Sequence, residues 1–129
     1  MKIIQIKETC LYVQDLSISK SFYYNKLGFS IISHVENRHI FFRVGSSILL
    51  CFIPEVTKNE KNLPPHYAYG PQHIAFEVQA EDYNFWMDKV KAEGIELIHI
   101  QKWKNKLNSF YFRDPDGHIL EIVPTGIWE

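Results

Sequence analysis

Hydrophobic and polar positions follow the same order twice along the chain. Alternating β-forming residues predict a short strand over residues 8–13 and an equivalent strand over residues 73–78. After each strand, large hydrophobic residues recur at helical spacing. A glycine ends each helical segment, Gly28 in the first half and Gly94 in the second, because glycine takes the left-handed conformation that closes a helix at little cost. The pattern therefore predicts two copies of one folding unit.

The hydrophobic positions of the two predicted helices match in kind and spacing. They are Phe22, Tyr23 and Leu27 in the first half, and Phe85, Trp86 and Val90 in the second. Either Asp15 or Ser17 can cap the first helix, since both side chains accept hydrogen bonds from free backbone N–H groups. Three strands are predicted after each helix, at residues 30–36, 39–44 and 47–53, and then at 96–103, 109–113 and 119–123. Each half thus has the order βαβββ.

The predicted fold class is α+β, with two βαβββ repeats that form a cupped mixed sheet. We expect a single domain over residues 1–129, with repeat units at roughly 2–54 and 72–124. A polar loop at 55–71, which contains two consecutive prolines, joins them. Glu8 and His73 begin the equivalent first strands of the two repeats. The two residues should therefore approach each other across a pseudo-twofold axis.

Composition narrows the class of protein without identifying it. The 129 residues carry a formal net charge of −1 and no basic stretch, which gives nucleic-acid binding little support. No apolar window is long enough to span a membrane, and the first residues do not match a signal peptide. We therefore expect a cytoplasmic protein in which Cys10 and Cys51 stay reduced.

Three segments resemble the vicinal oxygen chelate superfamily, which includes glyoxalase I, bleomycin-resistance proteins, fosfomycin-resistance thiol transferases and extradiol dioxygenases. They are "LYVQDLSISKSFYYNKLGF", "GPQHIAFEV" and "SFYFRDPDGHILEIVPTGIW". The last is the most specific, and the chain is most similar to small glyoxalase-like bacterial proteins. The resemblance implies a fold in which a cupped sheet holds one divalent metal ion. It also implies a homodimer that binds a small molecule.

Carried over residue by residue, the resemblance implies that Glu8, His73 and Glu121 are the metal ligands. The fourth family position falls on Leu49 or Leu50, neither of which can bind a metal. One imidazole with two carboxylates suits Zn, Ni, Mn, Fe or Co, and spacing does not select among them. The identity of the ion is therefore left open.

The residues themselves support this set to different degrees. Glu121 interrupts an apolar strand and shares one face with Ile119 and Val123, so an inward carboxylate there needs a cation. Glu8, taken alone, could be a solvent-exposed carboxylate at a strand end. His73, taken alone, could be a hydrogen-bonded core histidine. Their equivalent positions in the two repeats favour the ligand role.

Other polar residues carry weaker predictions. Tyr111, Arg113 and Trp103 are the predicted substrate-binding residues, although Arg113 could instead pair with a neighbouring aspartate. His66, Tyr67 and Tyr69 could form a lid, or simply a surface loop. Surface or strand-face positions are expected for His34, His39, His99 and His118. Neither cysteine has an adjacent base in the sequence, so thiol catalysis is not expected.

Three functions remain open at this point. The first is a metal-dependent enzyme in which Glu121 and Glu8 also act in catalysis, with lyase, isomerase or thiol-transfer chemistry. Fosfomycin-type transfer is disfavoured, because those family members carry a histidine where Glu8 stands. An extradiol dioxygenase is disfavoured because only one histidine is placed. The alternative class is a metal-free protein that sequesters a flat drug, for which the aromatic content is suited.

Overall fold

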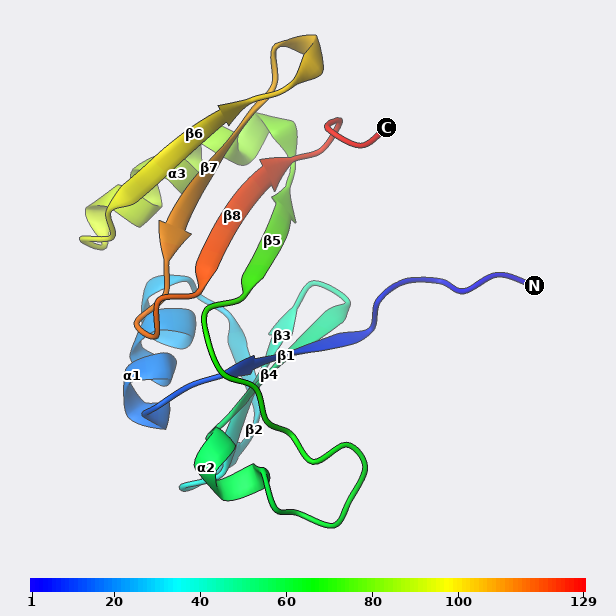
Figure 1. Cartoon of the computed structure of the whole chain (residues 1–129). Helices are drawn as coiled ribbons and strands as arrows, with labels where there is room; N and C mark the ends of the chain where they lie inside the picture. Colours follow the sequence, from blue (N-terminus) through cyan, green and yellow to red (C-terminus); the bar gives the residue numbers. More distant parts are fainter. The chain divides into compact units, whose positions relative to one another are not determined.

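The structure, a computed structural model, describes all 129 residues and divides into two compact units. Unit 1 comprises Met1–Gly70 and unit 2 comprises Pro71–Glu129, so the boundary falls within the predicted loop 55–71. In each unit a strand is followed by helical turns and then by three further strands (Figure 1). The fold class is α+β with two four-stranded mixed sheets, as the sequence predicted. None of the helices has the length and apolar character to cross a membrane.

Unit 1 is built on one four-stranded sheet in the order β1-β4-β3-β2. Its elements are β1 (Glu8–Tyr12), α1 (Leu16–Lys20), the π-helical segment η1 (Ser21–Lys26), β2 (Ser30–Val35), β3 (His39–Val44), β4 (Ser47–Phe52) and α2 (Pro54–Thr57). Strand β1 is parallel to β4, and the remaining pairs are antiparallel. The first strand therefore lies at an edge of the sheet.

Unit 2 repeats this topology with the order β5-β8-β7-β6. Its elements are β5 (His73–Val78), the 3₁₀ segment η2 (Ala80–Asp82), α3 (Tyr83–Ala92), β6 (Leu97–Lys102), the 3₁₀ segment η3 (Lys104–Lys106), β7 (Asn108–Arg113) and β8 (Ile119–Pro124). Strand β5 is parallel to β8, and the other pairs are antiparallel. The internal repeat read from the sequence is thus present in the strand order.

Local sequence signals account for most element ends. Asp15 is the N-cap of α1, where its carboxylate accepts hydrogen bonds from the N–H groups of Ser17 and Ile18. Gly28 and Gly94 both have positive φ, as expected where a helix ends. The start of the linker was predicted wrongly. Residues 55–57, expected in the loop, belong to α2, because a proline in the first turn favours helix initiation.

Each sheet has one face that packs against its own helix. In unit 2 this face is made of apolar side chains that alternate with polar ones along the strands, and they are Phe110, Phe112, Leu120 and Ile122. Val90 of α3 is fully buried, and Tyr83 of the same helix packs on Phe110. In unit 1, Tyr23 packs on Phe42 in the same way. The opposite face of each sheet is mixed: it carries Phe41 and Phe52 in unit 1, and Ile119 and Val123 beside Glu121 in unit 2.

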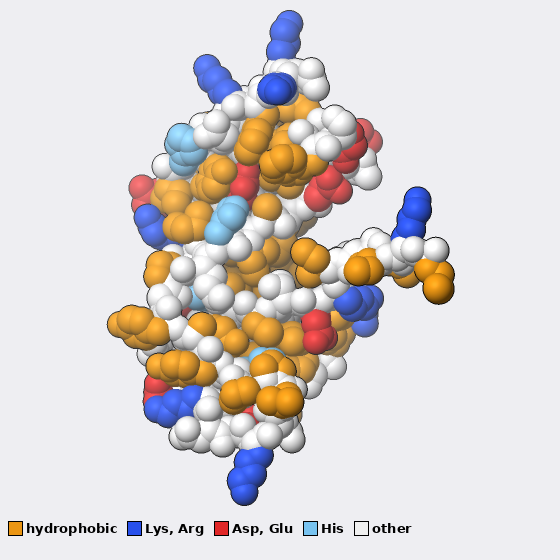
Figure 2. All heavy atoms as spheres, turned by 45° about the vertical axis from the view of Figure 1, so that its right-hand side comes forward, with side chains coloured by type: hydrophobic (Ala, Val, Ile, Leu, Met, Phe, Trp, Pro, Cys, Tyr) orange, Lys and Arg blue, Asp and Glu red, His pale blue; other side chains and the backbone are white.

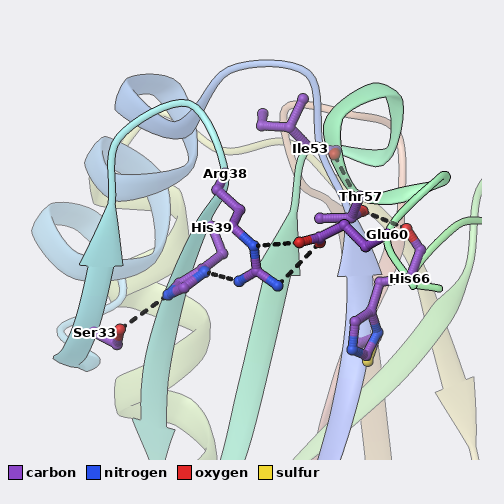
Figure 3. A network of polar contacts seen from close by, with 8 residues as sticks. Ser33, Arg38, His39, Ile53, Thr57, Glu60 and His66 are labelled. Carbon is purple, nitrogen blue, oxygen red and sulfur yellow. Dashed lines mark hydrogen bonds and ion pairs between the residues drawn. The ribbon is translucent and has the colours of Figure 1, made fainter. Parts of the chain in front are cut away.

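A polar network ties the β2–β3 hairpin of unit 1 to the segment after α2 (Figure 3). Arg38 donates two hydrogen bonds to the carboxylate of Glu60, at 3.0 and 3.2 Å. Arg38 also donates to Nδ1 of His39, 2.5 Å away. Since Nδ1 accepts, the other ring nitrogen of neutral His39 carries the proton and donates to the hydroxyl of Ser33. The network therefore requires a neutral imidazole.

His39 begins β3 and is only 7% exposed, so of the two placements expected for it, surface or strand face, it has a buried one on a strand. Burial first, and then the positive charge of Arg38, lower the pKa of His39, and Glu60 opposes part of this effect. The pKa in the folded state thus lies below the ordinary value of about 6.5 that the unfolded chain has. As pH falls through that value, the unfolded chain binds a proton that the folded chain does not. Folding stability is consequently lost on the acid side.

We expect His39→Gln to remove this acid-side loss. At pH 8 the variant should unfold with a free energy lower by about 1 to 3 kcal/mol, because two partly buried hydrogen bonds are weakened. Between pH 7 and pH 5.5 the difference from the wild type should shrink, as the wild type alone pays for protonating this histidine. Urea denaturation at both pH values measures it. A difference that stays constant would contradict the neutral, donor-bound imidazole.

Candidate metal centre

The open face of unit 2 carries a row of polar side chains across all four strands. Glu121 of β8 lies opposite Tyr111 of β7, and Tyr111 lies opposite His99 of β6. His73 is the first residue of β5, which pairs in parallel with β8. On the unit 2 part of Figure 2, histidine and acidic side chains lie among hydrophobic ones. The alternation that buries one face of each strand thus gathers four chemically active side chains on the other.

His73 and Glu121 form the central pair of this face. The Nε2 atom of His73 lies 3.2 Å from Oε1 of Glu121. The other ring nitrogen, Nδ1, lies 3.0 Å from the backbone carbonyl oxygen of Ile119 and must donate to it. In the neutral imidazole, Nε2 is therefore unprotonated. Two lone-pair atoms face each other at hydrogen-bond distance, and this arrangement needs a proton or a cation between them.

The burial of Glu121 makes a neighbouring proton or cation more important for stability. The residue is 4% exposed, whereas the side chain of His73 is 51% exposed. The second carboxylate oxygen of Glu121, Oε2, is buried and has no hydrogen-bond partner. A buried carboxylate oxygen left unpaired is costly, and proteins retain one mainly where a ligand completes it. Glu121 therefore has the environment expected of a ligand to a cation.

The geometry fits a divalent metal ion. Two donor atoms that are each about 2.1 Å from one ion, at tetrahedral or octahedral angles, lie about 3.0 to 3.4 Å apart. The 3.2 Å separation of Nε2 and Oε1 falls in that interval. Histidine ligands usually donate their second ring N–H to a carbonyl or carboxylate, as His73 does to Ile119. The donor set and its orientation thus suit a metal.

Tyr111 adds a hydrogen-bond donor beside this pair. Its ring lies 5.9 Å from the ring of His73, nearly parallel to it. Burial first, and then the negative charge of Glu121 and a hydrogen bond to its carboxylate, raise the pKa of the Tyr111 phenol, while Ser109 opposes part of this effect. The phenol consequently stays protonated at neutral pH, and its hydroxyl is directed at the Glu121 carboxylate, where it can also donate to an oxygen bound beside that group.

The other two predicted substrate-binding residues lie further along β7 and its turn. Trp103 is half-buried, donates from its indole nitrogen to the hydroxyl of Ser109 at 2.8 Å, and packs against Trp128. Arg113 is exposed at the end of β7. Neither residue contacts the His73–Glu121 pair directly, so their roles remain predictions.

Glu8, the third predicted ligand, is the first residue of β1 in unit 1 and is exposed. Its charge lies near Cys10, because burial first and Glu8 second raise the pKa of that thiol. Leu49 and Leu50 are both buried, and neither can supply a ligand. Within each unit taken alone, no three His, Cys, Asp or Glu side chains lie close enough to hold one ion. Ligation of a metal by Glu8 is therefore a proposal.

Sequence reasoning missed one thiol–imidazole contact. Nδ1 of His66 lies 3.7 Å from Sγ of Cys10, although 56 residues separate them (Figure 3 draws the sulfur beside the ring). The His66 ring also stacks on Phe52, and its carbonyl oxygen accepts a hydrogen bond from Thr57. His66 is thus held against the sheet of unit 1. No local sequence pattern could have revealed this partner, because the loop supplies it.

Two further histidines differ in environment from each other. His118 is 2% exposed and accepts a hydrogen bond from the N–H of Gln72, so it is a buried structural residue and not a surface residue. His99 is exposed, as expected, but it belongs to the row of side chains on the open face. Its ring lies 5.6 Å from that of Tyr111.

Comparison with known proteins places this chain in a family. The model of the Glyoxalase/Bleomycin resistance protein/Dioxygenase superfamily matches residues 5–122. The chain therefore belongs to this superfamily, also called the vicinal oxygen chelate superfamily, and it has the glyoxalase-like fold.

Individual relatives are informative as well. The chain is 35% identical over 129 residues to the metallothiol transferase FosB of Bacillus licheniformis, covering 99% of this chain and 80% of that protein. It is 28% identical over 115 residues to the glutathione transferase FosA of Serratia marcescens, covering 87% and 74%. Among solved structures, lactoylglutathione lyase from Agrobacterium tumefaciens is similar with a TM-score of 0.89 and 29% identity, covering 96% of each chain.

We expect the unpaired oxygen of Glu121 to make the metal-free protein less stable than an apolar variant. In the presence of a chelator at pH 8, Glu121→Met should raise the free energy of unfolding by about 1 to 3 kcal/mol, since a buried unsatisfied group is removed. Glu77→Met, at an exposed position of β5, is the matched control and should change it by less than about 0.5 kcal/mol. A clear loss of stability in Glu121→Met would show that the carboxylate is satisfied by the protein alone.

Proposed function

We propose that this protein is a divalent-metal-dependent thiol transferase that opens an epoxide-bearing phosphonate such as fosfomycin. One observation carries the proposal. Nε2 of His73 and Oε1 of Glu121 face each other at 3.2 Å with lone pairs on both, and the remaining oxygen of Glu121 is buried without a partner. A shared metal ion would stabilise this arrangement, whereas without one the buried carboxylate oxygen destabilises the fold.

His73, Glu121 and Glu8 would hold the ion. When bound, a divalent ion supplies Lewis-acid stabilisation of the oxygen that leaves the epoxide carbon. Three protein ligands leave coordination positions open for substrate oxygens. The exposed side of His73 makes the pair accessible from the open face of the sheet.

The remaining side chains of that face bind and orient the substrate. The protonated phenol of Tyr111 donates a hydrogen bond to a substrate oxygen beside Glu121. Arg113 supplies a fixed positive charge for a phosphonate, and guanidinium geometry matches such oxygens well. Trp103, fixed through its hydrogen bond to Ser109, provides an apolar wall. The site thus combines one anion-binding side and one apolar side.

The named relatives favour thiol transfer over the other reactions considered. Both FosB and FosA are named as transferases that act with a thiol or with glutathione. Fosfomycin-type members of the family carry a histidine where this chain has Glu8. On sequence grounds this difference disfavours thiol transfer. An oxygen ligand in place of a nitrogen ligand still suits the same divalent ions, so the change need not abolish the reaction.

A second candidate is isomerase or lyase chemistry on a glutathione adduct. The structural similarity to lactoylglutathione lyase, with a TM-score of 0.89 over 96% of both chains, favours it. Both candidates use a metal and a thiol compound. They differ in whether a carbon–sulfur bond forms at an epoxide or a proton moves within an existing adduct.

Metal binding is the first test. Calorimetric titration of the chelator-treated protein with Mn²⁺ should show one site per chain, and His73→Asn, Glu121→Gln and Glu8→Gln should each weaken it by at least about 100-fold. The exposed control Glu77→Gln should leave affinity unchanged. Equal affinity in wild type and Glu121→Gln would contradict the metal centre. If only Glu8→Gln were neutral, the third ligand would be assigned wrongly.

Product analysis is the second test. The Mn²⁺-loaded protein should convert fosfomycin and L-cysteine, or fosfomycin and glutathione, to a ring-opened thioether detected by mass spectrometry. The same preparation is assayed for formation of S-lactoylglutathione. Formation of this product alone would favour the second candidate. Tight binding of fosfomycin with no product in either assay would contradict both enzymatic proposals and favour sequestration.

A further inference from the structure

His99 has a feature that none of the proposed roles uses. It is an exposed residue of the edge strand β6, paired in register with Tyr111. Its Nε2 atom lies 3.1 Å from Oε1 of Gln101, two residues further along the same strand. The ring therefore projects from the open face of unit 2 with one nitrogen already bound.

The amide of Gln101 fixes which ring nitrogen carries the proton. The amide nitrogen of Gln101 donates to the backbone carbonyl oxygen of Lys102 at 3.1 Å, so Oε1 is the atom that faces His99. An amide oxygen only accepts hydrogen bonds, and Nε2 of neutral His99 must therefore carry the proton. The second nitrogen, Nδ1, is left with a lone pair. This is the orienter-and-base arrangement of an enzymatic proton acceptor.

We infer that His99 is the general base that takes the proton of the incoming thiol, an inference that rests on the proposed thiol transfer. In a displacement at an epoxide carbon, the thiol approaches from the side opposite the breaking carbon–oxygen bond. The base thus belongs away from the groups that hold the oxygen. His99 and Glu121 are two strands apart, about 10 Å between Cα atoms, with Tyr111 between them.

The step balances without any further reactant. As the carbon–sulfur bond forms, the carbon–oxygen bond of the epoxide breaks and the thiol proton moves to Nδ1 of His99. The alkoxide oxygen takes one proton from solvent, and the imidazolium returns one to solvent. The product is a thioether alcohol, and no oxidant or reductant takes part.

The side chains that flank His99 are a phenol and an amide. The titratable group that faces it from β7 is Tyr111, whose pKa is raised by burial and by Glu121, so that it stays neutral. Gln101, its partner on β6, carries no charge. Because β6 is the edge strand, no strand flanks it on the other side.

The rate as a function of pH tests this role. With the Mn²⁺-loaded full chain, fosfomycin and L-cysteine, His99→Gln should lower kcat/KM at pH 7 by about 10²- to 10³-fold. At pH 9.5, above the ordinary thiol pKa of about 8.5, the deficit should shrink to less than about tenfold, because solvent already deprotonates the thiol. His34→Gln, an exposed strand histidine of unit 1, is the matched control and should match the wild type at both pH values. An equal loss at both pH values would mean a structural role and overturn the inference.

A spectroscopic readout is independent of turnover. Long-range ¹H–¹⁵N correlation spectra should show neutral His99 with its proton on Nε2, and Gln101→Ala should relax this preference. A proton on Nδ1 would overturn the inference. The two proposals also fail differently. A wild type that transfers no thiol contradicts the proposed function, whereas an active wild type matched by His99→Gln at pH 7 contradicts the base alone.

Discussion

The candidate site depends on one contact between two groups that repel each other unless a proton or a cation lies between them. The parallel pairing of β5 with β8 places His73 beside Ile119, whose carbonyl oxygen accepts a hydrogen bond from the single N–H of the neutral ring. The free lone pair is thereby turned towards a buried carboxylate 3.2 Å away. His73 can turn away only by giving up its hydrogen bond to Ile119, and Glu121 is held in a buried position. The fold thus holds two electron-pair donors in the geometry that a metal ion stabilises.

The rest of unit 2 is arranged around this contact. One face of the sheet is closed by α3 and supplies the hydrophobic stability that offsets the cost of burying Glu121. The other face presents a phenol beside the carboxylate and an oriented imidazole two strands away. A small molecule lying across these strands would contact the carboxylate, then the phenol and then the imidazole. Each strand of the sheet therefore supplies a different chemical group to the site.

The sequence predicted the repeat, the succession of strands and helix along each unit and the unusual character of Glu121. These follow from alternation and spacing, which a single chain displays directly. It could not predict the neutral, buried state of His39 or the contact between Cys10 and His66, because both depend on partners from distant segments. His99 was placed correctly on a strand face but its orientation by Gln101 was missed. The available signal was that His99 and Gln101 are two residues apart on one strand and so share a face. Side-chain rotamers decide whether two such residues form a hydrogen bond.

The central claim is that His73 and Glu121 share one metal ion. Crystals of the protein grown with Mn²⁺, with diffraction recorded where manganese scatters anomalously, test it most directly. The account predicts one anomalous peak about 2.2 Å from both Nε2 of His73 and a carboxylate oxygen of Glu121. A peak at another location, or none at saturating Mn²⁺ with the two side chains still 3.2 Å apart, would contradict it.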